Sequence, residues 1–72
     1  MSFEVFYENL GKRIKKLRED KNLTQEKLAE RATISLDYLG KIEVNINRPG
    51  LVTLLKLANA LDISMEELFK TL

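Results

Sequence analysis

The stretch from Leu23 to Glu43 most constrains how this 72-residue chain folds, because it carries two helix-start signals eleven residues apart. Thr24 and Ser35 can each cap a helix, since a hydroxyl accepts a hydrogen bond from a backbone N–H that the first turn leaves unpaired. Apolar residues flank each cap at the spacing of a hydrophobic staple. Only about three residues remain for the turn, so the two helices must cross steeply. The pattern predicts a helix-turn-helix over about residues 24–44.

The N-terminal segment has the pattern of one amphipathic helix over about residues 3–21. Its apolar residues recur at intervals of three and four, which places them on one face: Phe3, Phe6, Tyr7, Leu10, Ile14 and Leu17. Gly11 weakens this helix by about 1 kcal/mol relative to alanine.

The C-terminal third predicts two more helices, over about residues 51–70. The first has more apolar surface than a single core contact needs. Ser64 opens a capping box that starts the second. Met65, Phe69 and Leu72 then remain on an outer face, and an exposed apolar patch of that kind commonly marks a partner surface. The alternative is that these side chains fill the single core.

The five helices predicted above and the length of 72 residues indicate one compact all-α domain spanning residues 1–72. The chain has no cysteine and no histidine, which excludes disulfides and the thiolate and imidazole ligands of common metal sites. The chain also has no glycine-rich phosphate loop. Nothing in the sequence therefore indicates an enzyme, a cofactor or a small-molecule ligand. No apolar run approaches the ~18 residues of a membrane span and no signal peptide is visible, so we expect a cytoplasmic protein.

The net charge of +1 is small, but it is unevenly distributed. Residues 12–48 carry ten Lys or Arg against six Asp or Glu, a net charge of +4. The positive excess therefore coincides with the predicted helix-turn-helix, as in an electrostatic footprint for nucleic acid. The bias is moderate, and a merely solvated surface can have the same composition.

Several motifs in and after the helix-turn-helix occur in a recognisable order: Leu23–Glu30, Ile34–Ser35, Lys41–Glu43, Asn47–Gly50 and Leu54–Leu61. Together they resemble the Cro and phage-repressor (XRE) family over about residues 10–70. The resemblance implies a lambda-repressor-like fold and a sequence-specific regulator of transcription that binds double-stranded DNA. It also implies a homodimer on a palindromic operator, with the recognition helix 36–44 in the major groove. A repressor, an antitoxin and a restriction–modification controller fit equally well.

The family's base-reading positions correspond here to Leu36, Asp37 and Lys41. Lys41 can donate to O6 and N7 of guanine, and Leu36 can pack on a thymine methyl group. Asp37 can accept from N4 of cytosine, or it can simply complement the helix dipole. Gly40 costs about 1 kcal/mol in mid-helix, and close backbone approach to DNA or to a neighbouring helix would explain it.

Phosphate contacts are expected around this helix, from Gln25, Tyr38, Asn45, Asn47 and Arg48. The resemblance implies that Gln25 grips a phosphate and braces the recognition helix, and it stands at a helix N-terminus, where an anion is favoured. Asn45 replaces a family glycine and tolerates the left-handed conformation.

The resemblance also implies a structural ion pair between Arg18 and Glu43, largely desolvated and bidentate. Thr33 departs from the family, which has glycine there. A β-branched residue in the left-handed region is strained by about 1–2 kcal/mol, so either the turn has another shape or the strain is tolerated.

A second hypothesis is a protein-interaction module of the same fold that does not bind DNA. Asp37, Leu36 and the near-neutral net charge favour it. Salt dependence separates the two hypotheses, because DNA binding weakens steeply with added salt.

Overall fold

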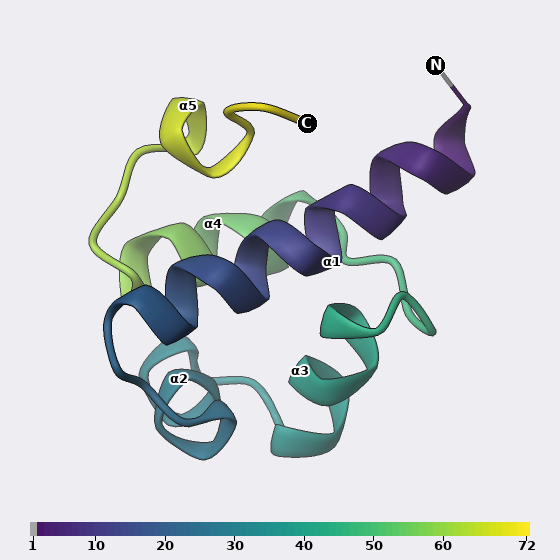
Figure 1. The fold of residues 1–72 in the computed structure, drawn as a ribbon. Helices are drawn as coiled ribbons and strands as arrows, with labels where there is room; N and C mark the ends of the chain where they lie inside the picture. The colour runs from purple at the N-terminus through teal and green to yellow at the C-terminus, as the bar shows by residue number, and fades with distance from the viewer. Residues whose placement is uncertain (1) are drawn as a thin grey trace.

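The computed structural model describes residues 2–72 and consists of five helices joined by short turns (Figure 1). The helices are α1 (Phe3–Asp20), α2 (Gln25–Ala32), α3 (Leu36–Glu43), α4 (Leu51–Ala60) and α5 (Met65–Leu68). No strand occurs among the described residues, so the predicted all-α fold is confirmed. The last helix is a single turn and ends short of the predicted residue 70. None of the helices in residues 2–72 is both long and apolar enough to cross a membrane.

Helix α1 is the longest element and lies across the other helices (Figure 1). It packs against α3, while α2 contacts both α3 and α4, and α4 contacts α5. Every helix contributes to one core, whose largest fully buried side chains are Leu10, Ile14, Leu28, Leu39, Ile42, Leu57, Leu61 and Leu68. The helix-turn-helix is therefore held by the whole domain.

Side-chain caps start four of the five helices. The hydroxyls of Ser2, Thr24, Ser35 and Ser64 each accept a hydrogen bond of 3.0–3.1 Å from the backbone N–H three residues further on. A cap of this kind stabilises a helix by about 1 kcal/mol relative to alanine. Three of these caps were predicted from the sequence, and Ser2 was not.

The first four helices all end in the same way, with a non-glycine residue at a φ of 57–61° soon after the last turn. These residues are Asn22, Thr33, Asn45 and Asp62. The backbone N–H of the next residue returns to a carbonyl in the preceding helix, as in a Schellman motif, at 2.8–3.1 Å in all four cases. The turn after α2 thus keeps the left-handed shape, and the strain at Thr33 is tolerated.

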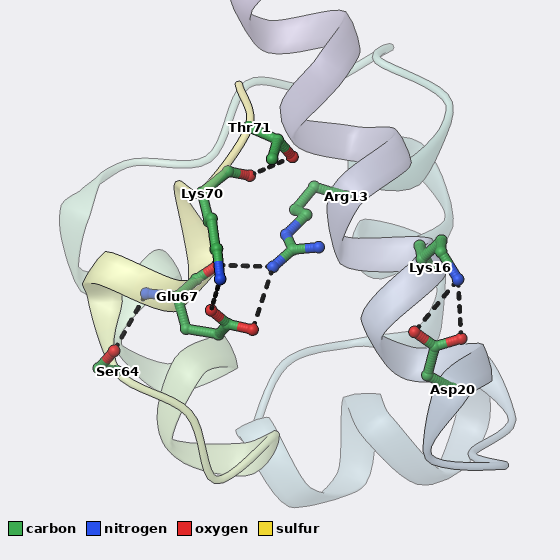
Figure 2. A network of polar contacts seen from close by, with 7 residues as sticks. All are labelled: Arg13, Lys16, Asp20, Ser64, Glu67, Lys70 and Thr71. Atoms are coloured by element: carbon green, nitrogen blue, oxygen red, sulfur yellow. Dashed lines mark hydrogen bonds and ion pairs between the residues drawn. The ribbon is translucent and has the colours of Figure 1, made fainter.

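Helix α5 is anchored to α1 by a polar contact (Figure 2). The Nη2 group of Arg13 donates to the backbone oxygen of Glu67 at 2.8 Å and lies 3.4 Å from the carboxylate of the same residue. The Arg13 side chain is mostly buried. This contact fixes the C-terminal turn against α1.

Candidate nucleic-acid interface

Helix α3 presents one face to the core and the opposite face to solvent. Leu39 and Ile42 are buried, whereas Leu36 and Asp37 are exposed and Lys41 is partly exposed. The structure therefore brings the three expected base-contact residues together on the outward side of α3. The major groove of B-DNA is wide enough to admit an α-helix.

An ion pair joins two of these outward residues. The Nζ atom of Lys41 lies 3.0 Å from Oδ2 of Asp37, one helical turn earlier. Exposed pairs at this spacing stabilise a helix by about 0.3–0.5 kcal/mol. Asp37 thus has a specific partner as well as its favourable place in the first turn. Lys41 must share or leave this carboxylate before it can donate to a base.

The end of α3 is tied to α1 by the expected ion pair between Arg18 and Glu43. Two parallel hydrogen bonds join them, Nε to Oε2 at 2.8 Å and Nη2 to Oε1 at 3.0 Å. Both residues are buried, and Nη1 of Arg18 also donates to the backbone oxygen of Leu23 at 2.7 Å. Hydrogen bonding to the Glu43 carboxylate raises the pKa of the Arg18 guanidinium, and this outweighs the opposite effect of burial.

Gln25 extends this network from the first turn of α2. Its Nε2 group donates to Oε1 of Glu43 at 3.0 Å, so it braces the end of α3. Its Oε1 atom lies close to Gly40, where an added Cβ would be 3.9 Å away. Glu43 is therefore held from both α1 and α2, which fixes the position of α3 relative to both helices.

Three more candidates for phosphate contact lie on α3 or in the loop that follows it. Tyr38 packs partly against the core, with its hydroxyl 3.5 Å from Oγ1 of Thr53 on α4. Asn45 adopts the left-handed conformation expected of it, with a φ of 61°. The backbone N–H of Asn47 donates to the oxygen of Lys41 at 3.2 Å, which folds the loop back onto α3.

Arg48 lies at the end of this loop and contacts α1. Its Cζ atom is 4.8 Å from the centre of the Tyr7 ring, the distance of a cation–π contact. The loop runs beside the N-terminal half of α1 (Figure 1). The sequence suggested no functional part for Tyr7, because only the tertiary fold brings residues 7 and 48 together.

The expected dimer residues are less exposed than the sequence suggested. Met65 and Leu72 are partly buried against the core, and Phe69 is 36% exposed, with its ring centre 6.1 Å from that of Phe6. Exposed apolar side chains also lie on α1 and around α3, and one group of them lies on α4. We call this the α4 outer face, formed by side chains that are about half or more exposed: Leu51, Val52 and Leu55.

A hollow of about 340 Å³ opens between α1 and the C-terminal residues, lined by Asn9, Lys12, Arg13, Lys16, Thr71 and Leu72. Its cations already have carboxylate partners: Lys12 with Glu8, Arg13 with Glu67 and Lys16 with Asp20 (the last two in Figure 2). The hollow is therefore bordered by paired charges. Within residues 2–72, no three acidic, histidine or cysteine side chains converge as a metal site would require.

Two short helices joined by a tight turn, the second with an exposed polar face, define a protein of the helix-turn-helix class. A family model described as helix-turn-helix, HTH_3, matches residues 14–68. This chain belongs to the HTH_3 family. The resemblance to the Cro and phage-repressor proteins is thereby confirmed.

Named relatives include repressors and regulators. The chain is 45% identical over 56 residues to the immunity repressor protein of Bacillus phage phi105, a match that covers 78% of this chain and 39% of the relative. It is 37% identical over 60 residues to the HTH-type transcriptional regulator SinR of Bacillus subtilis, covering 82% of this chain and 54% of SinR. The chain thus spans about half or less of the length of these two relatives.

Similar solved structures include two restriction–modification controller proteins. C.AhdI from Aeromonas hydrophila is 41% identical, with a TM-score of 0.85, over 88% of this chain and 96% of that protein. Wild-type C.Esp1396I is 28% identical, with a TM-score of 0.86, over 97% of this chain and 88% of that protein. The fold is thus shared nearly end to end with small proteins.

Proposed function

We propose that this chain is a sequence-specific regulator of transcription that binds double-stranded DNA. The observation that carries the proposal is the outward face of α3, held in place by the buried network of Arg18, Glu43 and Gln25. A base-reading helix must be held rigidly, because base contacts discriminate only when donors and acceptors align. The relatives named as repressor and regulators support the same function.

In this proposal α3 enters the major groove. Lys41 donates to guanine, Leu36 packs on a thymine methyl group, and Asp37 accepts from cytosine. Contacts to the phosphates come from residues around α3 and fix its register: Gln25, Tyr38, Asn45, Asn47 and Arg48. We propose no catalytic activity for the chain and a cytoplasmic location.

The operator is palindromic and bound by a homodimer, in which two copies of α3 lie about one turn of DNA apart. The dimer surface includes the expected Met65, Phe69 and Leu72, and it extends over the α4 outer face, where apolar side chains lack cover within the described chain. The similar proteins include both a phage repressor and restriction–modification controllers, so the biological role stays open between these and an antitoxin.

A second candidate function is a protein-interaction module of the same fold. The Asp37–Lys41 ion pair favours it, because the carboxylate neutralises the cation that DNA would attract. Exposed apolar side chains add to this surface at both ends of α3: Leu36 at its start, and Val44 and Ile46 just after its end.

Binding to a mixed-sequence duplex over a series of salt concentrations tests the proposed function. A regulator of DNA loses affinity steeply between about 50 and 200 mM salt, because contacts with phosphates release counterions. Fluorescence anisotropy of a labelled duplex measures this loss. Absence of binding even at about 50 mM salt would contradict the proposal and favour the interaction module.

A further inference from the structure

The contact between Tyr7 and Arg48 joins the start of α1 to the loop that leads from α3 to α4. The guanidinium carbon of Arg48 lies 4.8 Å from the centre of the Tyr7 ring. Within residues 2–72, Arg48 has no hydrogen bond or ion pair with another side chain. The cation–π contact with the Tyr7 ring is therefore the interaction that can order this exposed side chain.

Both partners are attached to well-fixed parts of the molecule. Tyr7 packs against the core and meets Phe6 edge to face, with ring centres 5.3 Å apart. On the loop, the backbone N–H of Ile46 donates to the oxygen of Lys41 at 2.8 Å, and Pro49 is buried. The ring and the loop thus approach each other from two fixed elements.

We propose that Tyr7 is a positioning residue that holds the Arg48 side chain ready for contact with a DNA phosphate. This inference rests on the proposed function. A guanidinium held by a ring face keeps N–H groups at its edge free to donate to phosphate oxygens. A free arginine side chain loses rotamer freedom when it binds, and prior ordering by a ring reduces that loss.

The position of Arg48 explains why such ordering is useful here. Arg48 lies in the loop between α3 and α4, so its cation is outside the helix that is proposed to read bases. A phosphate contact there fixes register without reading sequence. The effect of Tyr7 on binding must then be the same for every DNA sequence.

Four proteins test the proposal: wild type, Tyr7→Leu, Arg48→Ala and the double variant. Affinity for two unrelated duplexes is measured by anisotropy over a salt series. Tyr7→Leu is expected to weaken binding about two- to fivefold on both duplexes alike, the factor that an exposed cation–π contact corresponds to. Arg48→Ala should reduce the slope of log affinity against log salt by about 0.9, the value for one phosphate contact. In the Arg48→Ala background, Tyr7→Leu should change nothing further.

Tyr7→Phe is the matched control, because it keeps the ring face and should bind within twofold of wild type. A second readout needs no DNA: the Arg48 side-chain protons should show an upfield ring-current shift in NMR spectra of wild type and Tyr7→Phe, lost in Tyr7→Leu. Thermal unfolding of each variant reports whether the domain still folds.

Three results would overturn the inference. If Tyr7→Leu weakens binding equally with and without Arg48, Tyr7 acts through the fold and not through Arg48. If Tyr7→Leu tightens binding, the ring holds Arg48 away from DNA. If Arg48→Ala leaves affinity and salt slope unchanged while wild type binds, Arg48 contacts no phosphate. Failure of wild type to bind any DNA would instead overturn the proposed function, with the ring-current shift still reporting the contact.

Discussion

Gly11 in α1 directly faces the carbonyl oxygen of Ile42 in α3. A Cβ atom at Gly11 would lie 2.6 Å from this oxygen and 3.0 Å from the carbonyl oxygen of Glu43. Both neighbours are backbone atoms, which cannot rotate away as a side chain can. The glycine therefore sets how closely α1 approaches the proposed recognition helix.

Replacing Gly11 with alanine is expected to destabilise the domain by about 1–3 kcal/mol through overpacking, although alanine alone would favour the helix by about 1 kcal/mol. Urea unfolding measures this change. Because α3 must shift to make room, affinity for DNA should fall as well. A variant about 1 kcal/mol more stable than wild type, the gain expected from helix propensity alone, would show that the two helices separate at no cost.

Gly40 provides the matched comparison, because it also lies in mid-helix but has room around it. An added Cβ would meet only Oε1 of Gln25, at 3.9 Å, which is ordinary van der Waals contact. Of the two reasons considered for this glycine, close approach of a neighbouring helix is therefore not supported, and close approach of DNA remains.

Gly40→Ala should accordingly stabilise the domain by up to about 1 kcal/mol and weaken DNA binding. Unfolding and anisotropy on the same protein sample measure the two effects. If Gly40→Ala lowers the free energy of unfolding, the glycine is needed for packing within the protein. If the affinity for DNA is unchanged, DNA does not approach this part of the backbone.

Glu43→Gln tests the buried network, because it keeps the shape of the side chain and removes its charge. Arg18 then remains as a buried cation without its counter-charge, and we expect a loss of about 3–5 kcal/mol in the free energy of unfolding. Gln25→Ala removes one hydrogen bond from the same carboxylate and should cost less, about 1.5–3 kcal/mol, the range for a hydrogen bond to a charged group. Equal, small losses in the two variants would mean that the ion pair contributes little.

Asp37→Asn tests the ion pair on the outward face of α3. The change frees Lys41 and removes a charge that DNA repels, so affinity for unrelated duplexes should rise several-fold and the salt slope should steepen. Discrimination between duplexes should fall, because the acceptor for cytosine is weakened. If Asp37→Asn and wild type bind every duplex with the same affinity, Asp37 stabilises α3 and has no part in DNA binding.

Local signals in the sequence were sufficient to predict most of the fold. Thr24, Ser35 and Ser64 begin helices where their hydroxyls suggested, because capping depends on a few adjacent residues. Asn45 takes the left-handed conformation for an equally local reason. Thr33 does so despite its branched side chain, because the steep turn between α2 and α3 requires that backbone shape.

Contacts between distant segments were beyond such signals. Helix propensity predicts only that Gly11 destabilises α1. It does not predict that α1 and α3 pack closely at this glycine, because that contact exists only in the tertiary fold. The sequence also left open whether Met65 and Leu72 lie on an outer face or fill the core, and both are partly buried against the core. Arg18 and Glu43 were matched only through the family resemblance, because nothing local links residues 25 positions apart.

Selection from a library of random DNA duplexes tests the central claim most directly, with the recovered sequences read for wild type, Lys41→Ala and Arg48→Ala. The proposed regulator should enrich a palindromic motif. Lys41→Ala should relax the preference at one position of each half-site, and Arg48→Ala should weaken binding uniformly without changing the motif. If wild type enriches no motif, α3 does not read DNA sequence, and the central claim is wrong.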